Sequence, residues 1–391
     1  MTTPYSLTSA HEAHLEAHIA QVIAAQGGWT GFDAFMALAL YTPGLGYYAN
    51  DSAKFGTMPY AKQAGVSVAG SDFVTAPEMT PLFGQTLAAQ VAQALQVTQT
   101  AEVWEFGAGS GALALQLLQT LEALGQPLPR YRIVELSGSL RARQQDKLQK
   151  YAQTVQWVSE LPDRLQGVVL GNEVLDAMPV KLLARVAGVW YERGVALGPV
   201  LEPAPDVETT GTPRFVWQDR PTALRPPLAI EGAHDYLTEI HVQGESFVRT
   251  LADKLTQGAV FLIDYGFPEH EYYHPQRHMG TVMCHRGHRA DPDPLTFVGL
   301  KDITAHVNFT GIALAAQEAG LGVLGYCTQA RFLINCGLVS RLESASLPQR
   351  VAAQKLIMEH EMGELFKVIG LYQGAPWQAI GFSHGDRTHT L

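Results

Sequence analysis

Apolar and polar positions along this chain alternate in a way that predicts strands and helices in turn. Five short apolar runs predict strands, at residues 101–106, 131–136, 154–158, 167–180 and 259–266. Three amphipathic segments between them predict helices, at residues 111–124, 138–151 and 245–258. The fourth run ends in a polar loop, and the third helix is expected to stop at Gly258. Continuous apolar strands interleaved with amphipathic helices indicate a doubly wound α/β fold, with helices on both faces of a parallel sheet.

The first hundred residues predict helices instead of strands. The segment HEAHLEAHIAQVIAAQGGW has a helical pattern and ends on a glycine pair, which stops a helix. A short helix broken at Pro43 follows, then a loop rich in Gly, Ser and Ala over residues 51–72, and then a further helix. We therefore expect residues 1–100 to form a helical cap that contributes to the ligand site of a domain spanning residues 101–391.

Two long segments interrupt the alternating pattern. Residues 181–245 form an insertion that begins with a β-hairpin pattern, VKLLARVAGVWYERGVALG, with Gly188 near its turn, and continues into a Pro-rich region. An aromatic and His-rich loop follows the fifth strand, at residues 267–300. An insertion at the ligand edge of a doubly wound sheet is well placed to form a lid, a substrate wall or a docking surface.

The composition excludes several function classes. The 37 acidic and 27 basic residues give a net charge of −10, which argues against general nucleic-acid or anionic-membrane binding but not against a basic peptide. Cys284, Cys327 and Cys336 lack a CxxC spacing and are expected to be reduced thiols. The first basic residue is Lys54 and the first arginine Arg130, and no apolar stretch is long enough for a membrane span. A cytoplasmic location is therefore expected.

The segment VWEFGAGSGALA, residues 103–114, predicts a strand that turns on glycines into a helix. Gly107, Gly109 and Gly111 let the backbone approach a ligand, and the helix N-terminus offers unpaired N–H groups. No Gly-Lys-Ser/Thr follows, which excludes a triphosphate-binding P-loop. The pattern from Gly107 to Ala112 does match the dinucleotide motif, so both a dinucleotide and S-adenosylmethionine (SAM) remain candidates.

Acidic residues at the strand ends favour SAM. Glu105 precedes the first glycine by two residues, where a carboxylate crowds a pyrophosphate but suits the ammonium group of a methionine moiety. Glu135 ends the second strand and can accept hydrogen bonds from ribose hydroxyls. Asn172, Glu173 and Asp176 follow the fourth strand, at the edge where such sheets bind ligands. The simpler alternative is that Asn172 and Asp176 cap a helix.

The chain resembles the MidA-type family of SAM-dependent methyltransferases, which is related to the mitochondrial complex I assembly arginine methyltransferase. The resemblance runs from about residue 15 to the C-terminus and is weakest in the insertion. Six segments carry it in the expected order: ALYTPGLGYYA, DFVTAPEMTPLFGQ, EFGAGSGALA, GNEVLDAMPV, LIDYGFP and DITAHVNFTGI.

The resemblance implies a class I methyltransferase fold with an N-terminal helical cap and an inserted β-containing subdomain. It assigns the methionine part of SAM to the turn from Glu105 to Gly111, the ribose to Glu135 and the sulfonium region to Asn172. The segment from Asp72 to Glu78 would cover the cofactor. The residues assigned to the cofactor are Thr75, Pro77, Glu105, Phe106, Gly107, Gly109, Ser110, Gly111, Glu135, Leu136 and Asn172. S-adenosyl-homocysteine would be the product.

The nearest precedent implied by the resemblance is symmetric dimethylation of an arginine on a core subunit of respiratory complex I. Buried carboxylates can bind two guanidinium nitrogens and aim the third at the methyl group. Glu173 and Asp176 are three residues apart and share one face if their segment is helical, so we predict that they are the catalytic pair. The rival prediction places the acceptor at the HRGHRADPDP segment or at Asp302 and His306. Asn308 stands where the family pattern has Asp.

Several possible metal ligands lie close together in sequence, at His270, His274, Cys284, His285 and His288, but no metal-binding motif accompanies them and no metal is expected. Three function classes therefore remain. A protein arginine methyltransferase leads; a methyltransferase for a small molecule or another protein side chain is second; a SAM-binding assembly factor without turnover is third. A protein substrate is the expected partner, and the sequence leaves a homodimer open.

Overall fold

The computed structural model describes residues 4–50, 61–63, 66–68, 74–199 and 215–391. The chain forms two compact units, each assembled from three separate stretches of sequence. Unit 1 comprises Met1–Ser52, Ala177–Gln243 and His270–Ala305. Unit 2 comprises Ala53–Asp176, Gly244–Glu269 and His306–Leu391. Residues 53–100, expected in the cap, thus group with the predicted methyltransferase strands, whereas the stretches 177–243 and 270–305 group with residues 1–52.

Unit 2 is built on an eight-stranded sheet with the order β17-β18-β12-β7-β4-β5-β6, in which β16 also pairs with β12. Strands β4, β5, β6, β7 and β12 pair in parallel, and β18 is antiparallel to both of its neighbours. The strands are β4 (Glu102–Phe106), β5 (Arg130–Val134), β6 (Val155–Val158), β7 (Leu165–Asn172), β12 (Leu255–Phe267), β16 (Val307–Asn308), β17 (Gly322–Thr328) and β18 (Phe366–Gln373). Their order reverses between β4 and β7, which creates the switch point where such sheets bind ligands.

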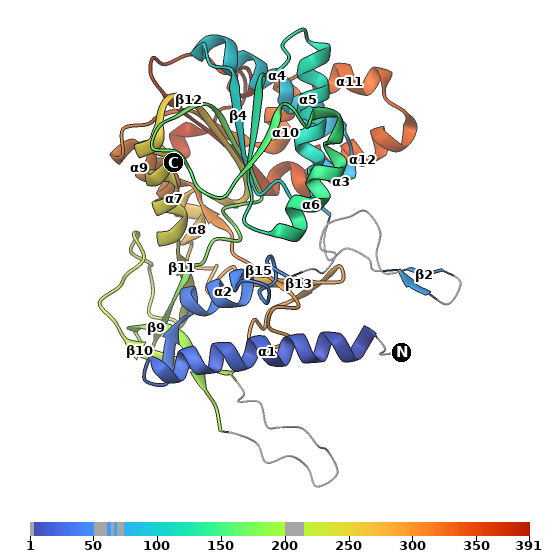
Figure 1. Cartoon of the computed structure of the whole chain (residues 1–391). Helices are drawn as coiled ribbons and strands as arrows, with labels where there is room; N and C mark the ends of the chain where they lie inside the picture. Colours follow the sequence, from blue (N-terminus) through green and yellow to red (C-terminus); the bar gives the residue numbers. More distant parts are fainter. Residues whose placement is uncertain (1–3, 51–60, 64–65, 69–73, 200–214) are drawn as a thin grey trace. The chain divides into compact units, whose positions relative to one another are not determined.

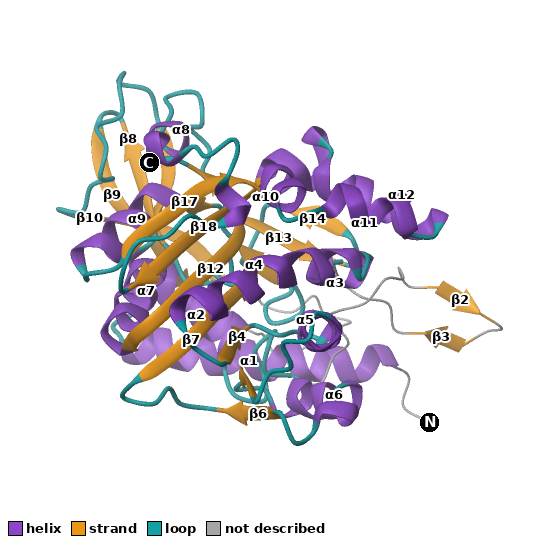
Figure 2. Cartoon of the chain, turned by 90° about the horizontal axis from the view of Figure 1, so that it is seen from above, coloured by secondary structure: helices purple, strands orange, loops and turns teal. Residues whose placement is uncertain are grey.

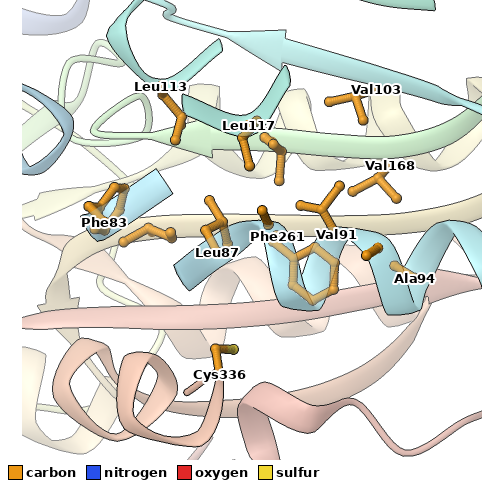
Figure 3. Close-up of a cluster of buried hydrophobic side chains, with 14 of the residues drawn as sticks. Phe83, Leu87, Val91, Ala94, Val103, Leu113, Leu117, Val168, Phe261 and Cys336 are labelled. Carbon is orange, nitrogen blue, oxygen red and sulfur yellow. The ribbon is translucent and has the colours of Figure 1, made fainter. Parts of the chain in front are cut away.

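Helices cover both faces of this sheet, and Figure 1 shows α7 and α9 on the side opposite to α4 and α5. The helices of unit 2 include α4 (Leu82–Thr98), α5 (Ala112–Ala123), α7 (Val242–Lys254), α9 (Phe309–Glu318), α10 (Gln329–Asn335), α11 (Leu338–Ser344) and α12 (Leu347–Ile357). Leu87 and Val91 of α4 pack with Leu117 of α5 against Val168 and Phe261 of the sheet (Figure 3). Strands buried on both faces read as continuous apolar runs, and this is why the pattern predicted a parallel sheet.

The predicted doubly wound α/β fold is confirmed, and each predicted run overlaps an observed strand; in the run 167–180 the strand β7 ends at Asn172 and the polar loop follows. The expected helix stop at Gly258 is wrong. Helix α7 ends at Lys254, and β12 begins at the next residue and runs through Gly258. Gly258 has φ +144, and a Cβ there would lie 1.9 Å from the carbonyl oxygen of Gly167 in β7. The glycine therefore permits close approach of two backbones inside the sheet.

Unit 1 holds an antiparallel sheet in the order β1-β9-β8-β11, with β10 paired to β9. The strands are β1 (Trp29–Gly31), β8 (Lys181–Val186), β9 (Val189–Leu197), β10 (Phe215–Pro221) and β11 (Tyr236–Ile240). The predicted hairpin is confirmed as β8–β9, and its turn residues Ala187 and Gly188 have φ +48 and +81. Two central residues with positive φ are the geometry that suits a tight hairpin.

Unit 1 also contains the helices α1 (Pro4–Ala25), α2 (Phe32–Tyr41) and α8 (Glu269–Tyr272). The first residue of α8, Glu269, is counted in unit 2. A small sheet with the strand order β14-β13-β15 completes unit 1. That sheet consists of β13 (Met283–Arg286), β14 (Arg289–Asp291) and β15 (Asp302–Thr304). Figure 2 distinguishes the helices from the strands by colour. The segment 51–72, expected to be a loop, contains the short antiparallel pair β2 (Ala61–Gln63) and β3 (Val66–Val68).

All three cysteines are buried and free of disulfides, as expected for reduced thiols. Among the described residues, no helix combines the length and apolar character that a membrane span requires.

Candidate active site

The glycine turn joins β4 to α5 at the switch point of the sheet. Gly107, Gly109 and Gly111 all have positive φ, at +65, +53 and +81. A Cβ on Gly107 would lie 2.8 Å from Cγ2 of Val174, so the turn packs directly against the segment that follows β7. Gly111 precedes α5 and offers no side chain to cap it. The turn therefore brings bare backbone to the carboxyl edge of β4, as predicted.

Glu105 lies at the end of β4 and is 2% exposed. The Tyr131 hydroxyl of β5 donates a 2.7 Å hydrogen bond to its carboxylate. Burial raises the pKa of Glu105 to about 7; the hydrogen bond from Tyr131 lowers it and the charge of Glu135 raises it further. A buried carboxyl group with such a pKa is stabilised in its ionised form by an arriving cation.

Glu135 directly follows β5 and is held by two donors. The backbone N–H of Ser137 donates to Oε1 at 2.8 Å, and the side-chain amide of Gln144 donates to Oε2 at 2.9 Å. Ser137 caps α6 (Gly138–Lys147), because its hydroxyl oxygen accepts the Leu140 N–H. The next side chain, Leu136, is 80% exposed. An acidic residue with an exposed apolar neighbour suits a nucleoside, whose ribose is polar and whose base has an apolar face.

The predicted covering segment is represented by α3 (Ala76–Met79), which Thr75 precedes. Asp72 lies outside the described residues. Gln116 of α5 donates from its side chain to the carbonyl of Pro77 at 2.8 Å. Glu78 accepts a hydrogen bond from the hydroxyl of Ser110 in the glycine turn, and Lys147 donates to the same hydroxyl at 2.7 Å. The structure thus brings the predicted covering segment to the glycine turn.

The segment after β7 carries Asn172, Glu173 and Asp176. Residues 173–178 form no helix, in agreement with the predicted polar loop, so the helix-capping alternative for Asn172 and Asp176 is wrong. The helical spacing that would place Glu173 and Asp176 on one face is absent as well. Glu173 has φ +55, an uncommon conformation for a residue other than glycine. The side-chain N–H of Asn172 donates to Glu173 at 3.0 Å, while its buried Oδ1 has no hydrogen-bond partner among the described residues.

Two residues of β12 that sequence analysis missed organise this segment. Asp264 accepts backbone N–H bonds from Val174, Leu175 and Asp176 at 3.1, 2.9 and 3.2 Å, all on Oδ2. Burial and the neighbouring charges of Asp176 and Glu173 raise the pKa of Asp264 well above its ordinary value, against the backbone donors that lower it. The Tyr265 hydroxyl donates to Asp176 Oδ2 at 2.5 Å. The available signal was an aspartate inside an otherwise apolar strand, in LIDYG.

The residues of the rival acceptor prediction lie in different surroundings. In unit 1, Asp302 is buried and accepts two contacts from the Tyr48 hydroxyl, at 2.8 and 2.9 Å. In the same unit, the buried Lys301 ammonium donates to Asp291 and to the carbonyl of Asp293, so this Pro-rich loop is internally held. His306 belongs to unit 2, where its ring packs against Tyr265 and stacks on Phe267.

Asn308 caps helix α9. Its side-chain oxygen accepts the Gly311 N–H at 3.2 Å, a contact that an aspartate in the same place also makes. Within the part of the chain that the structure describes, no group of three or more His, Cys, Asp or Glu side chains has the arrangement of a metal site.

The residues of unit 2 fit a bound SAM molecule in three respects. Gly107 presents exposed backbone in the turn, at a position where a side chain would collide with Val174. Asn172 has a buried side-chain oxygen without a hydrogen-bond partner among the described residues, and Leu136 leaves an apolar surface next to Glu135. Two features define the class I SAM-dependent methyltransferases. One is this sheet order, in which the antiparallel strand β18 lies between β12 and the edge strand β17. The other is a ligand site at the switch point of the sheet.

Comparison with known families agrees with this class. A family model described as "Putative S-adenosyl-L-methionine-dependent methyltransferase" matches residues 86–327. The chain belongs to this family, so SAM is its cofactor, and the resemblance to the MidA-type methyltransferases is confirmed.

Relatives and solved structures extend the comparison over the full chain. A protein from Burkholderia thailandensis, crystallised with bound S-adenosyl-homocysteine, is 47% identical and superimposes with a TM-score of 0.88 over 100% of this chain and 99% of its own. The mitochondrial protein arginine methyltransferase NDUFAF7 of Danio rerio is 27% identical, with 92% of this chain and 86% of the relative aligned. NDUFAF7 of Homo sapiens is 24% identical, over 86% of this chain and 78% of the relative.

Proposed function

We propose that this protein transfers the methyl group of SAM to an arginine side chain of a protein partner. The observation that carries the proposal is the group of three carboxyl side chains, Glu173, Asp176 and Asp264, that gathers where β7 and β12 end. The segment bearing the first two also packs against the glycine turn, through Val174. Acidic side chains beside the cofactor turn suit a cationic acceptor.

On the cofactor side, each residue has a role that follows from its surroundings. Glu105 provides a buried carboxylate for the ammonium group, and Glu135 accepts hydrogen bonds from the ribose. The exposed side chain of Leu136 packs on the base, and the unpaired oxygen of Asn172 faces the sulfonium. Thr75 and Pro77 cover the cofactor from the segment that Glu78 ties to Ser110. SAM supplies an electrophilic methyl group when bound.

On the acceptor side, the chain orients a poor nucleophile. A guanidinium is protonated in water, and its nitrogens attack carbon only when correctly aimed. Glu173 and Asp176 bind two of its nitrogens, and Asp264 fixes the turn that carries both carboxylates by accepting three of its backbone N–H groups. When the nitrogen–carbon bond forms and the sulfur–carbon bond breaks, the guanidinium group gives up one proton, which Glu173 accepts from the nitrogen that it binds.

The relatives support the same acceptor. The Danio rerio protein, aligned over 92% of this chain, is named a protein arginine methyltransferase. Subunits of respiratory complex I, expected from the family resemblance, are the first acceptors to test.

The test is a transfer assay with SAM labelled in its methyl group. Purified protein is incubated with a membrane and soluble extract from cells that lack it, and hydrolysed products are separated into methylated amino acids. The proposal expects label in methylarginine of a discrete protein band. Label in a small molecule, or in lysine or glutamine derivatives, contradicts it.

Variants separate the acceptor site from the cofactor site. Glu173→Gln should retain SAM affinity within about twofold and lose transfer by about 100-fold or more, as expected for loss of a positioning contact. Glu160→Gln, at an exposed position of unit 2, is the matched control and should leave both unchanged. If Glu173→Gln transfers methyl groups at the normal rate, the acceptor assignment is wrong.

A further inference from the structure

Gln144 of α6 is a buried residue to which no role has been given, and it contacts both halves of the cofactor site. Its side chain is 0% exposed. The amide nitrogen donates to the carbonyl of Gly109 in the glycine turn at 2.9 Å and to Oε2 of Glu135 at 2.9 Å. Its amide oxygen accepts the indole N–H of Trp157 at 2.8 Å. One side chain therefore spans the turn after β4 and the acid after β5.

The chemistry of the three partners fixes the orientation of this amide. An indole N–H only donates, whereas a peptide carbonyl and an ionised carboxylate only accept. The amide oxygen must therefore face Trp157, and both amide hydrogens are then used by Gly109 and Glu135. Only a side chain with one acceptor and two donors, at the length of glutamine, satisfies all three partners at once. Methionine matches its length and removes every hydrogen bond, and an ionised glutamate keeps only the contact with Trp157.

We infer that Gln144 is a positioning residue for SAM: it holds the Glu135 carboxylate at a set distance from the glycine turn. The inference rests on the cofactor site proposed above. The ribose bound by Glu135 and the methionine moiety held by the turn are joined in one flexible molecule, so the separation of the two binding groups selects the conformation in which it binds. Gln144 lies next to the end of the turn, since a Cβ built on Gly111 would come within 3.5 Å of its Cγ. Trp157 orients Gln144 in turn.

The first measurement is calorimetric titration of S-adenosyl-homocysteine into the purified full chain. Gln144→Met removes a hydrogen bond to a charged group and one to a carbonyl, so we expect the Kd to rise about 10- to 100-fold. Gln145→Met, at the exposed neighbouring position on α6, is the matched control and should bind normally. A normal Kd in a folded Gln144→Met variant overturns the inference.

A double-mutant cycle tests whether Gln144 acts through Glu135. If it does, Gln144→Met should weaken binding less in a Glu135→Gln background than in the native chain. Fold losses that simply multiply show that the two residues act independently and overturn the inference. If Glu135→Gln alone leaves the Kd unchanged, the proposed cofactor site fails instead, so the two failures are distinguishable.

Gln144→Glu gives a readout that a purely structural role would not change. The introduced carboxyl group lies beside Glu135, and two such groups at hydrogen-bond distance share one proton at low pH but repel when both ionise. The Kd ratio of variant to native chain should therefore be larger at pH 8 than at pH 5.5. A ratio independent of pH contradicts the inference. This variant keeps the contact with Trp157 and provides the test if Gln144→Met does not fold.

Discussion

Glu105 leads to a prediction about how cofactor affinity depends on pH. Its pKa is about 7, because the side chain is buried, whereas an exposed glutamate titrates near 4.5. In the free protein the carboxyl group is therefore about half protonated at pH 7. In the proposed cofactor site, only its ionised form attracts the ammonium group. Affinity for S-adenosyl-homocysteine should thus rise about fivefold between pH 6 and pH 7.

The ammonium group sets the upper limit of this rise. Affinity should fall again once the pH is high enough to remove the ammonium proton, because the neutral amine no longer attracts the carboxylate. Binding at pH 6.5 should also release about 0.8 of a proton, since about three-quarters of Glu105 is protonated at that pH. Calorimetry in two buffers with different ionisation enthalpies measures this release directly.

Glu105→Gln should abolish both the low-pH limb and the proton release. Glu102→Gln, on the same strand and paired with Arg130 and Arg132, is the control and should keep both. A native protein whose affinity is flat between pH 6 and pH 7, or a Glu105→Gln variant that keeps the native profile, would refute the reasoning.

The same carboxyl group affects the stability of the free protein. Its folded pKa is raised above the unfolded value, so the folded state binds the proton more tightly than the unfolded state. The contribution of Glu105 to the free energy of unfolding is therefore fully present below about pH 4.5. It is lost as the pH rises to about 7, and the total loss is about 3 kcal/mol. Glu105→Gln should remove that loss, which urea unfolding at pH 5 and pH 7.5 measures.

Three further substitutions have defined outcomes. Gly107→Ala, with φ +65 and a Cβ 2.8 Å from Val174, should weaken S-adenosyl-homocysteine binding at least about tenfold by titration; normal binding would mean the turn needs no glycine. Asn308→Ala should lower the free energy of unfolding, measured with urea, by about 1 kcal/mol, whereas Asn308→Asp should lower it much less. Equal losses in the two variants would contradict the capping role. Gly258→Ala should lower the free energy of unfolding by more than about 3 kcal/mol, because the new Cβ would meet the backbone of Gly167. Gly320→Ala is the control and should lower it by about 1 kcal/mol, since a Cβ there would contact nothing within 4 Å. Equal shifts of the melting temperature in the two variants would refute the packing argument.

Local pattern predicted the central sheet because each of its strands carries its own signal. A strand buried on both faces is a continuous apolar run, and a glycine turn is visible in a few consecutive residues. The glycine turn and the position of the acid after β5 were therefore accessible from Glu105, Gly107 and Glu135 alone. The helix stop at Gly258 was misread, because a glycine that ends a helix and one that lets two strands approach look identical in sequence.

The organisation of the site depends on contacts between distant residues. Asp264 and Tyr265 act on a turn about ninety residues earlier in the chain, and no periodicity connects them to it. Gln144 looked like one polar position on an amphipathic helix, yet it is buried between two loops. A polar side chain that satisfies buried partners cannot be recognised until those partners are placed.

The sequence by itself determined the doubly wound sheet, the glycine turn and the chemical class of cofactor, because short-range hydrophobic periodicity and backbone freedom are encoded in adjacent residues. Only the tertiary structure decided how separate stretches combine into two units and which polar groups meet at the carboxyl edge of the sheet. Those groups are joined by hydrogen bonds between residues far apart in the chain, and the energy of such bonds depends on the three-dimensional fold.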